Sequence, residues 1–541
     1  MFISPVPRER NQTVSSSDQR TILTIDMGTS GPKVALYAMD GSLIGSEFEE
    51  VGLILLPGGG AEQRPEEWWD AIRRATKRLL ARELADRRRI SAVCTTTQWS
   101  GTVAVDRSGQ HLMNAIIWMD SRGAKYMPGL TGGRVRIAGY GVTRLWRYLR
   151  LTGGAPGHSG KDSIAHILWI MRERPEIYGK TWKFLEPKDF INLRLTGRFA
   201  ASCESMALHW LTDNRDISRI RYDDRLIRMA GIDREKLPEL KSAIDILGPV
   251  QPEVAADLGL APDVPVVMGT PDVQAAAIGS GAVEDYEGHL YLGTSSWLTC
   301  HVPFKKVDIA NNMASLPSAR PDRYFIANEQ ESAGACLTFL RDKIVYHKDQ
   351  LLAESAQPDV YKLFDEVVAE VPAGSGKLIF TPWLFGERTP IEDHHIRGGF
   401  FNLSLHHTRS HMVRAVFEGV ALNSRWLLDS VESFIKRPLA EINLIGGGAN
   451  SDIWCRICAD VLNRPINQME APVLAGSRGV AFLAAIALGE MGFGDIAGKT
   501  RIARTYQPDP SNRGIYDELF REFKEIYLKN RKISARLNRG T

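Results

Sequence analysis

The chain has 541 residues, of which 44% are hydrophobic and 24% are charged. A chain of this length is longer than one hydrophobic core usually serves, so we expect at least two domains. The composition is that of an ordinary soluble protein. The formal net charge of +3 is too small for a polyanion-binding surface, which excludes nucleic acid as a partner. The most apolar helical stretch, residues 479–488, is about half of the ~20 residues that span a bilayer, so we expect a buried helix and no membrane partner.

The first half of the chain predicts an alternating α/β order. Strands are expected over 21–27 and 34–41, on either side of a Gly-Thr-Ser sequence, and a third strand follows within 40–51. Residues 65–85 begin with proline and acidic residues and place apolar residues at helical spacing, which predicts an amphipathic helix. A strand over 91–97 completes an order that is typical of an α/β domain.

The second half begins in a similar way. A short buried strand over 264–269 and a small-residue helix over 272–282 lead to a second pair of strands that breaks at Gly293. A long core helix is expected over 411–434, and residues 442–462 predict a strand, a glycine turn and a helix. The two Gly-Thr-Ser sequences therefore indicate two hairpins of one design.

These patterns divide the chain into two expected lobes. We predict an N-terminal lobe over 21–270, with a helical insertion or cap at about 125–250, and a C-terminal lobe over 271–541. Residues 1–20 lack the apolar run of a signal peptide and are expected to be a disordered leader.

The six cysteines do not form the pattern of a disulfide framework. Only Cys455 and Cys458 lie close together, in a helical pattern that lacks a second pair of metal ligands. We expect both to be core residues and the protein to work in a reducing cytoplasm.

Three glycine turns are candidates for phosphate binding: Gly28-Thr29-Ser30, Gly293-Thr294-Ser295 and Gly446-Gly447-Gly448. A glycine allows a tight turn or a close approach of the ligand, and the N–H groups of such a turn can donate to phosphate oxygens. Lys33 can add a positive charge beside the first turn. The sequence contains neither a GxxxxGK[ST] phosphate loop nor a GxGxxG dinucleotide motif.

Two acidic residues are candidates for chemistry on a bound phosphate. Asp272 follows a buried strand and precedes a helix, where a carboxylate can project into a site, although capping of that helix is an alternative explanation. Asp26 lies between Ile25 and Met27 in a buried strand, so it needs a partner such as a metal ion or its water shell.

These residues belong to a series of ordered motifs between about 22 and 490. The series resembles the FGGY family of carbohydrate kinases, and within that family it is most similar to xylulokinases. The matching stretches include DMGTSGPK at 26–33, TTQWSG at 96–101, PKDFINLRLTG at 187–197, GTPDVQAAAIGSG at 269–281, YLGTSS at 291–296 and GGGANSDIWCRICADVLNRPI at 446–466.

The resemblance implies a two-lobed α/β fold, the duplicated actin-like (ribonuclease H-like) ATPase fold, with an interlobe cleft. ATP would lie on the C-terminal lobe and the sugar in the N-terminal lobe. Asp272 matches the catalytic acid that accepts the hydroxyl proton, and Asp26 matches the acid that holds Mg²⁺ through water. The residues that match ATP-binding positions are Gly28, Thr29, Ser30, Lys33, Gly293, Thr294, Gly334, Gly447, Gly448 and Asp452.

The sequence departs from the xylulokinase pattern at the expected sugar-binding residues. Gln98, Trp99 and Ser100 replace a usual Gln-Met-His sequence, and Val273 stands where relatives commonly have a polar residue. Buried polar groups discriminate sharply between substrates. This departure from the pattern therefore leaves the identity of the sugar open.

The leading hypothesis is ATP-dependent phosphorylation of a ketopentose such as D-xylulose, in a protein that binds a small-molecule sugar and forms a homodimer, the commonest oligomer. Two alternatives stay open. One is a kinase for another polyol, sugar or sugar acid (glycerol-, ribulose- or gluconate-like), and the other is a sugar-responsive ATPase or sensor built on the same core.

Overall fold

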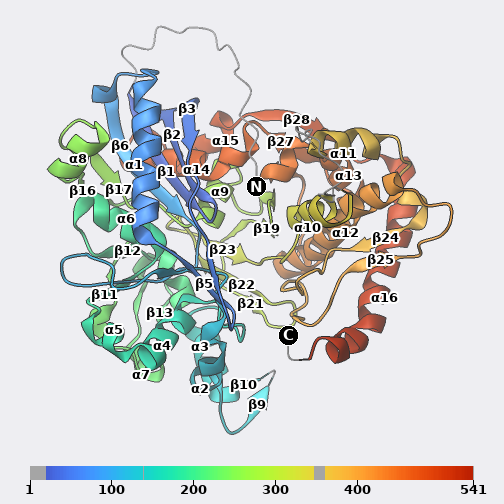
Figure 1. Cartoon of the computed structure of the whole chain (residues 1–541), viewed down its shortest axis with the longest axis horizontal. Coiled ribbons are helices and arrows are strands. Elements are labelled where there is room, and N and C mark those ends of the chain that lie inside the picture. Colours follow the sequence, from blue (N-terminus) through green and yellow to red (C-terminus); the bar gives the residue numbers. More distant parts are fainter. Residues whose placement is uncertain (1–19, 138, 346–359, 540–541) are drawn as a thin grey trace, which may run out of the picture.

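The computed structural model describes residues 20–137, 139–345 and 360–539 (Figure 1). The expected leader falls outside these residues except for Arg20. Two large sheets organise the described chain, and in Figure 1 the first lies on the left in blue and green while α12 (Arg409–Ile435) and α13 (Asp452–Leu462) lie on the right in orange.

The first sheet confirms the strands that were predicted in the first half. Its order is β16 (Ile246–Pro249), β17 (Pro265–Val267), β6 (Ile90–Thr97), β1 (Thr21–Gly28), β2 (Gly31–Ala38) and β3 (Leu43–Phe48). β1 and β2 form an antiparallel hairpin, β6 and β17 continue parallel to β1, and β16 closes the edge antiparallel. The predicted amphipathic helix is α1 (Pro65–Ala81), whose apolar face is buried.

The second sheet repeats these strand directions. Its order is β19 (Ser296–Thr299), β18 (Gly288–Leu292), β26 (Ile442–Ile445), β27 (Ile466–Met469) and β28 (Ile502–Tyr506). β18 and β19 form the antiparallel hairpin, β26 and β27 run parallel to β18, and β28 is antiparallel. The same sequence of directions in both sheets confirms the predicted duplication.

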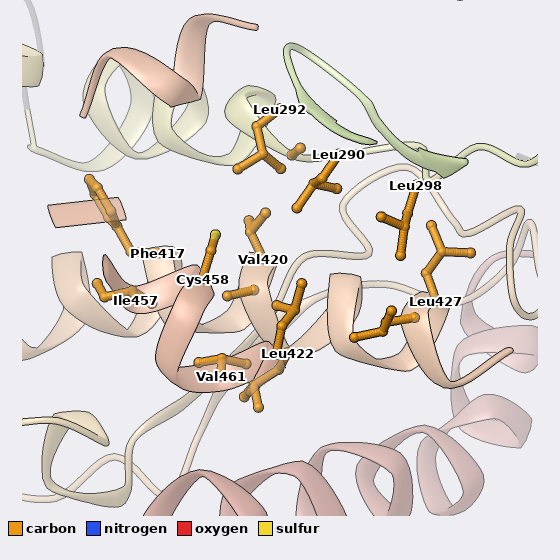
Figure 2. Close-up of a cluster of buried hydrophobic side chains, with 14 of the residues drawn as sticks. Leu290, Leu292, Leu298, Phe417, Val420, Leu422, Leu427, Ile457, Cys458 and Val461 are labelled. Carbon is orange, nitrogen blue, oxygen red and sulfur yellow. The ribbon is translucent and has the colours of Figure 1, made fainter. Parts of the chain in front are cut away.

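The core of the second half packs α12 and α13 against the second hairpin. Figure 2 shows the leucines of β18 and β19 facing side chains of the two helices; those labelled are Leu290, Leu292, Leu298, Phe417, Val420, Leu422, Leu427, Ile457, Cys458 and Val461. Cys455 and Cys458 are both fully buried in this core, as expected.

Two helices that are distant in the sequence, α9 (Asp272–Gly279) and α14 (Ala475–Ala487), cross closely. A β carbon on Gly279 would lie 1.8 Å from the carbonyl oxygen of Ala475, and one on Gly479 would lie 1.8 Å from that of Ala275. Only small residues allow this approach. Because α14 also packs on β1 and β6, a helix from the second half covers the first sheet, and Asp272 begins the helix that α14 crosses.

The region around 125–250 contains α3 (Val142–Leu151), α4 (Ser163–Glu173), α5 (Pro175–Lys180), α6 (Pro187–Thr196) and α7 (Asp224–Ala230). Its buried side chains include a separate hydrophobic cluster with Tyr148, Ile167 and Leu226. The extent of the insertion and the lobe boundary at 270 stay predictions. No helix in the described part of the chain is both long and apolar enough to cross a membrane.

Candidate active site

Asp272 is the first residue of α9, just beyond the carboxyl end of β17. Pro271 occupies the N-cap position and no side chain caps this helix, so the alternative explanation of Asp272 as a capping residue is wrong. The Asp272 Oδ1 accepts a 2.8 Å hydrogen bond from the N–H of Val273. Burial raises the pKa of Asp272 to about 7, and the nearby Asp26 carboxylate adds to the rise. A carboxylate that titrates near neutral pH is suited to general-base catalysis.

Asp26 and Lys33 face each other across the first hairpin. Lys33 Nζ lies 3.4 Å from Asp26 Oδ2, so the buried carboxylate has a charged partner within the protein. The predicted metal ion or water shell at Asp26 stays a prediction. A β carbon on Gly476 would lie 3.3 Å from the same Oδ2, so the start of α14 approaches Asp26 closely.

A magnesium ion fits these carboxylates. Mg²⁺ is commonly held by one or two carboxylates together with water and substrate phosphates. Asp26 lies close enough to Asp272 to raise its pKa. Within the described residues, no group of three or more His, Cys, Asp or Glu side chains forms a metal cage. The remaining ligands of an ion at Asp26 would therefore come from water and substrate.

Side-chain hydrogen bonds hold the first glycine turn in place. The Thr29 hydroxyl donates to Gln98 Oε1 at 3.0 Å and accepts from Trp118 Nε1 at 3.0 Å. Gln63 Nε2 donates to the Thr29 carbonyl at 2.8 Å, and Gln98 Nε2 donates to Gln63 Oε1 at 2.7 Å. Gln63 and Trp118, which were not predicted as site residues, thus hold the turn in place.

The tight turn of the first hairpin depends on Gly31 and not on Gly28. Gly31 has φ +141°, and its β carbon would lie 1.9 Å from the Glu49 carbonyl oxygen. A β carbon on Gly28 would meet no atom closer than 3.8 Å. Of the two roles that the sequence left open for Gly28, the tight turn belongs to Gly31, and the space beside Gly28 leaves room for a ligand. Ser30 is exposed at the tip.

Backbone hydrogen bonds hold the second glycine turn in place. The Gly334 N–H donates to the Gly293 carbonyl at 2.8 Å, and the N–H groups of Ala333 and Ala335 donate to the Thr294 carbonyl at 2.9 and 3.1 Å. A β carbon on Gly334 would lie 2.5 Å from the Gly293 oxygen, so the start of α10 (Gly334–Phe339) sits directly on the turn. The structure thus brings Gly293, Thr294 and Gly334 together.

The third glycine turn lies beside the second. β26 runs parallel to β18, and a β carbon on Gly448 would lie 2.8 Å from Leu292 Cβ. Gly447 has no atom within 4 Å of its β-carbon position. Asp452 begins α13 next to this turn, where Gln468 Nε2 donates to its Oδ1 at 3.1 Å. The predicted residues of the C-terminal half therefore gather at the carboxyl ends of two adjacent strands.

The predicted sugar-binding residues use their polar atoms within the protein. Gln98 is buried and bonded as described above. Trp99 Nε1 donates to the Ser205 carbonyl at 3.1 Å, and the Ser100 hydroxyl donates to the Lys161 carbonyl at 2.7 Å. Ser100 has φ +62°, so its backbone occupies the left-handed region. Gln98 fastens the first glycine turn, while Trp99 and Ser100 anchor their loop to the 125–250 region.

A group of charged side chains from both halves of the chain was not predicted from the sequence. Lys161 Nζ lies 3.3 Å from Glu331 Oε1, and Arg388 pairs with both Glu331 and Glu329. Glu329 also contributes to the raised pKa of Asp272, so it lies near that carboxylate. The alternation of Glu329 and Glu331, and the Arg388 of the GERTP sequence, were the available signals, but the pairing with Lys161 across the fold was not visible in the sequence.

Comparison with known proteins places this geometry in a family. The family model "FGGY family of carbohydrate kinases, N-terminal domain" matches residues 21–279, and the corresponding C-terminal domain matches 289–488. The chain belongs to the FGGY family of carbohydrate kinases. It is therefore a phosphotransferase, and the predicted family and enzyme class are confirmed.

Relatives of this FGGY kinase match nearly its whole length. A xylulose kinase from Bacillus subtilis is 26% identical over 524 residues, which cover 95% of this chain and 98% of that protein. The crystal structure of a gluconate kinase from Lactobacillus acidophilus has a TM-score of 0.83 at 26% identity and covers 96% of this chain and 100% of that one. A ligand-bound xylulose kinase from the same species has a TM-score of 0.81 at 26% identity and covers 94% and 98%. FGGY sugar kinases share the two-domain actin-like ATPase fold, so the predicted fold is confirmed.

Proposed function

We propose that this FGGY kinase transfers the γ-phosphoryl group of ATP to a hydroxyl of a ketopentose, such as D-xylulose to give the 5-phosphate. The observation that carries the proposal is the position of Asp272, a carboxylate with a pKa of about 7 at the start of α9, the helix that crosses α14. The similarity to the Bacillus subtilis xylulose kinase over 95% of the chain supports the choice of substrate.

The proposed reaction uses Asp272 as general base. Its carboxylate accepts the hydroxyl proton while the hydroxyl oxygen forms a bond to the γ-phosphorus, and the bond from that phosphorus to the β-phosphate oxygen breaks to release ADP. A positioned base contributes roughly 10²–10⁴-fold to such a reaction. Most of the remaining acceleration comes from alignment and charge neutralisation.

The glycine turns are proposed to bind the nucleotide. The first turn, with Gly28, Thr29 and Ser30, and the second, with Gly293 and Thr294, offer backbone N–H groups to the phosphates. Lys33 adds positive charge beside the first turn. Gly334 supports the second turn, and Gly447, Gly448 and Asp452 lie on the adenosine side. Asp26 would hold Mg²⁺ through water, and the ion would neutralise phosphate charge when bound.

A second candidate is a kinase for another polyol or for a sugar acid. The gluconate kinase structure, with a TM-score of 0.83, and the Gln98-Trp99-Ser100 sequence favour it. A sugar-responsive ATPase ranks below both, because Asp272 is retained.

The setting of the enzyme is part of the same proposal. Six free cysteines suit a reducing cytoplasm, and we expect a homodimer. We also propose a division into lobes near residue 270; the two family matches divide the chain between residues 279 and 289.

The test is acceptor-dependent ADP release by the purified protein with Mg-ATP and a panel of ketopentoses, polyols and aldonic acids. Phosphorus NMR of the product identifies the hydroxyl that was phosphorylated. We expect the strongest stimulation by a ketopentose. If only a different acceptor stimulates ADP release, that acceptor replaces the ketopentose as the proposed substrate. ATP turnover that is independent of every acceptor would overturn the kinase reaction in favour of an ATPase or sensor.

A further inference from the structure

A chain of ion pairs crosses between the two halves of the molecule. Lys161, from the loop before α4, lies 3.3 Å from Glu331 through Nζ and Oε1. Arg388 Nε donates to the same Glu331 oxygen at 3.0 Å, and Arg388 Nη1 donates to Glu329 Oε2. All four side chains are at least three-quarters buried. This ladder of Lys161, Glu331, Arg388 and Glu329 connects the 157–162 loop to the 329–331 segment.

The ladder borders the proposed acceptor site on two sides. At one end, the Ser100 hydroxyl donates to the Lys161 carbonyl at 2.7 Å, so the ladder begins at the 98–100 loop. At the other end, Gln330 exchanges two backbone hydrogen bonds with Ser296, at 3.1 and 2.8 Å, directly after the second glycine turn. Glu329 is also close enough to Asp272 to raise its pKa. A polyhydroxy acceptor with its reacting hydroxyl between Asp272 and a phosphate on that turn would therefore have Glu329 along one side of its site.

Glu329 has an oxygen available for a ligand. Its Oε2 is paired with Arg388, whereas its Oε1 makes no hydrogen bond within the described part of the chain. The charges of the two cations of the ladder are already neutralised, because Arg388 pairs with both carboxylates and Lys161 pairs with Glu331. Asp162 and Glu392 add further negative charge around Arg388.

We propose that Glu329 accepts a hydrogen bond from a hydroxyl of the acceptor and selects an uncharged polyhydroxy compound over one that carries its own carboxylate. This inference rests on the proposed function. A hydroxyl that donates to a carboxylate makes a charge-assisted bond. A substrate carboxylate would instead lie near Glu329 and Asp272. Lys161 and Arg388 are paired within the ladder and Lys33 is paired with Asp26, so this carboxylate would lose its hydration without gaining a partner.

Three variants test this role in ADP-release assays. Glu329→Gln removes the charge and keeps the shape, Glu329→Asp keeps the charge and withdraws the oxygen, and Glu518→Gln is a control on α16 (Arg513–Leu537), where Glu518 pairs with Lys377. The acceptors are ketopentoses and pentitols, compared with aldonic acids of the same chain length. ADP affinity, measured by calorimetry, reports whether each variant is folded.

The wild-type protein should prefer uncharged acceptors by at least about 100-fold in kcat/KM. Glu329→Gln should lower kcat/KM for the uncharged acceptor about 10- to 100-fold, mainly through KM, and should narrow the preference at least tenfold. Glu329→Asp should lower kcat/KM for the uncharged acceptor and narrow the preference less than Glu329→Gln, because the negative charge stays. Glu518→Gln should change neither kcat/KM for the uncharged acceptor nor the preference.

The outcomes separate this inference from the proposed function. A wild-type preference for aldonic acids would overturn the inference and leave the kinase reaction intact. An unchanged preference in a Glu329→Gln protein that binds ADP normally would do the same. No acceptor-dependent ADP release at all would overturn the proposed function itself.

Discussion

The two hairpin turns share the sequence Gly-Thr-Ser but are fastened differently. In the first, the Thr29 side chain bonds to Gln98 and Trp118. In the second, the backbone carbonyls of Gly293 and Thr294 bond to the start of α10, and the Thr294 hydroxyl has no hydrogen-bond partner in the described part of the chain. The repeated motif therefore fixes the hairpin, whereas the surrounding lobe determines which atoms hold it.

The largest expected effect on stability comes from substitution of the glycines of the first turn. Gly31→Ala would place a β carbon 1.9 Å from the Glu49 carbonyl oxygen at φ +141°, and we expect a loss of about 3 kcal/mol in the free energy of unfolding. Gly28→Ala meets no close atom and should change it by less than about 1 kcal/mol. Urea denaturation of both variants measures the difference, and similar losses would contradict the assignment of the turn to Gly31.

The threonines of the two turns give the next largest effect. Thr29→Val would leave the Trp118 N–H and the Gln98 carbonyl oxygen without their partner, at a cost of about 2 kcal/mol. Thr294→Val should cost less than about 0.5 kcal/mol, because only the backbone of Thr294 fastens its turn. Thermal unfolding of the two variants compares them directly. Equal destabilisation would show that the turns are held alike.

Asp272 should give an effect on stability of similar size, and this effect depends on pH. Its pKa in the folded protein is about 7, well above the usual value of an aspartate, so the folded state binds the proton more tightly than the unfolded state. The wild-type protein should therefore lose stability as pH rises from about 4 to 7. Because the side chain is partly exposed, water reduces the loss to about 2 kcal/mol.

The control for this effect is Asp272→Asn, which cannot titrate at this position. Its stability relative to the wild type should increase from pH 5 to pH 8 in urea denaturation. A stability difference that does not change with pH would contradict the raised pKa. The same titration predicts that kcat/KM of the wild-type enzyme rises as pH increases through about 7, since the base must be ionised.

Much of the fold followed from local sequence patterns. The alternation of β1, β2, α1 and β6 and the buried α12 were predicted because their apolar residues follow strand and helix periods. Family motifs led to Asp272, Asp26 and the glycine turns. The packing of α14 on the first sheet was not predicted, because the sequence of a buried helix does not indicate which sheet it covers.

The details of the site depended on contacts between distant residues. Gly28 and Gly31 cannot be distinguished in the sequence, because only the approach of the Glu49 carbonyl makes Gly31 necessary. The pairing of Lys161 with Glu331 joins residues that are 170 positions apart. Such pairs are set by the packing of the two halves, and spacing along the chain does not reveal them.

The most direct test of the account compares acceptor-dependent ADP release by the wild-type protein and by Asp272→Asn at pH 8, with the best acceptor of the panel. If Asp272 is the general base, the variant should bind ADP normally and lose about 10²–10⁴-fold in kcat, with little change in KM. A variant that retains the wild-type kcat would contradict the central claim that Asp272 accepts the hydroxyl proton.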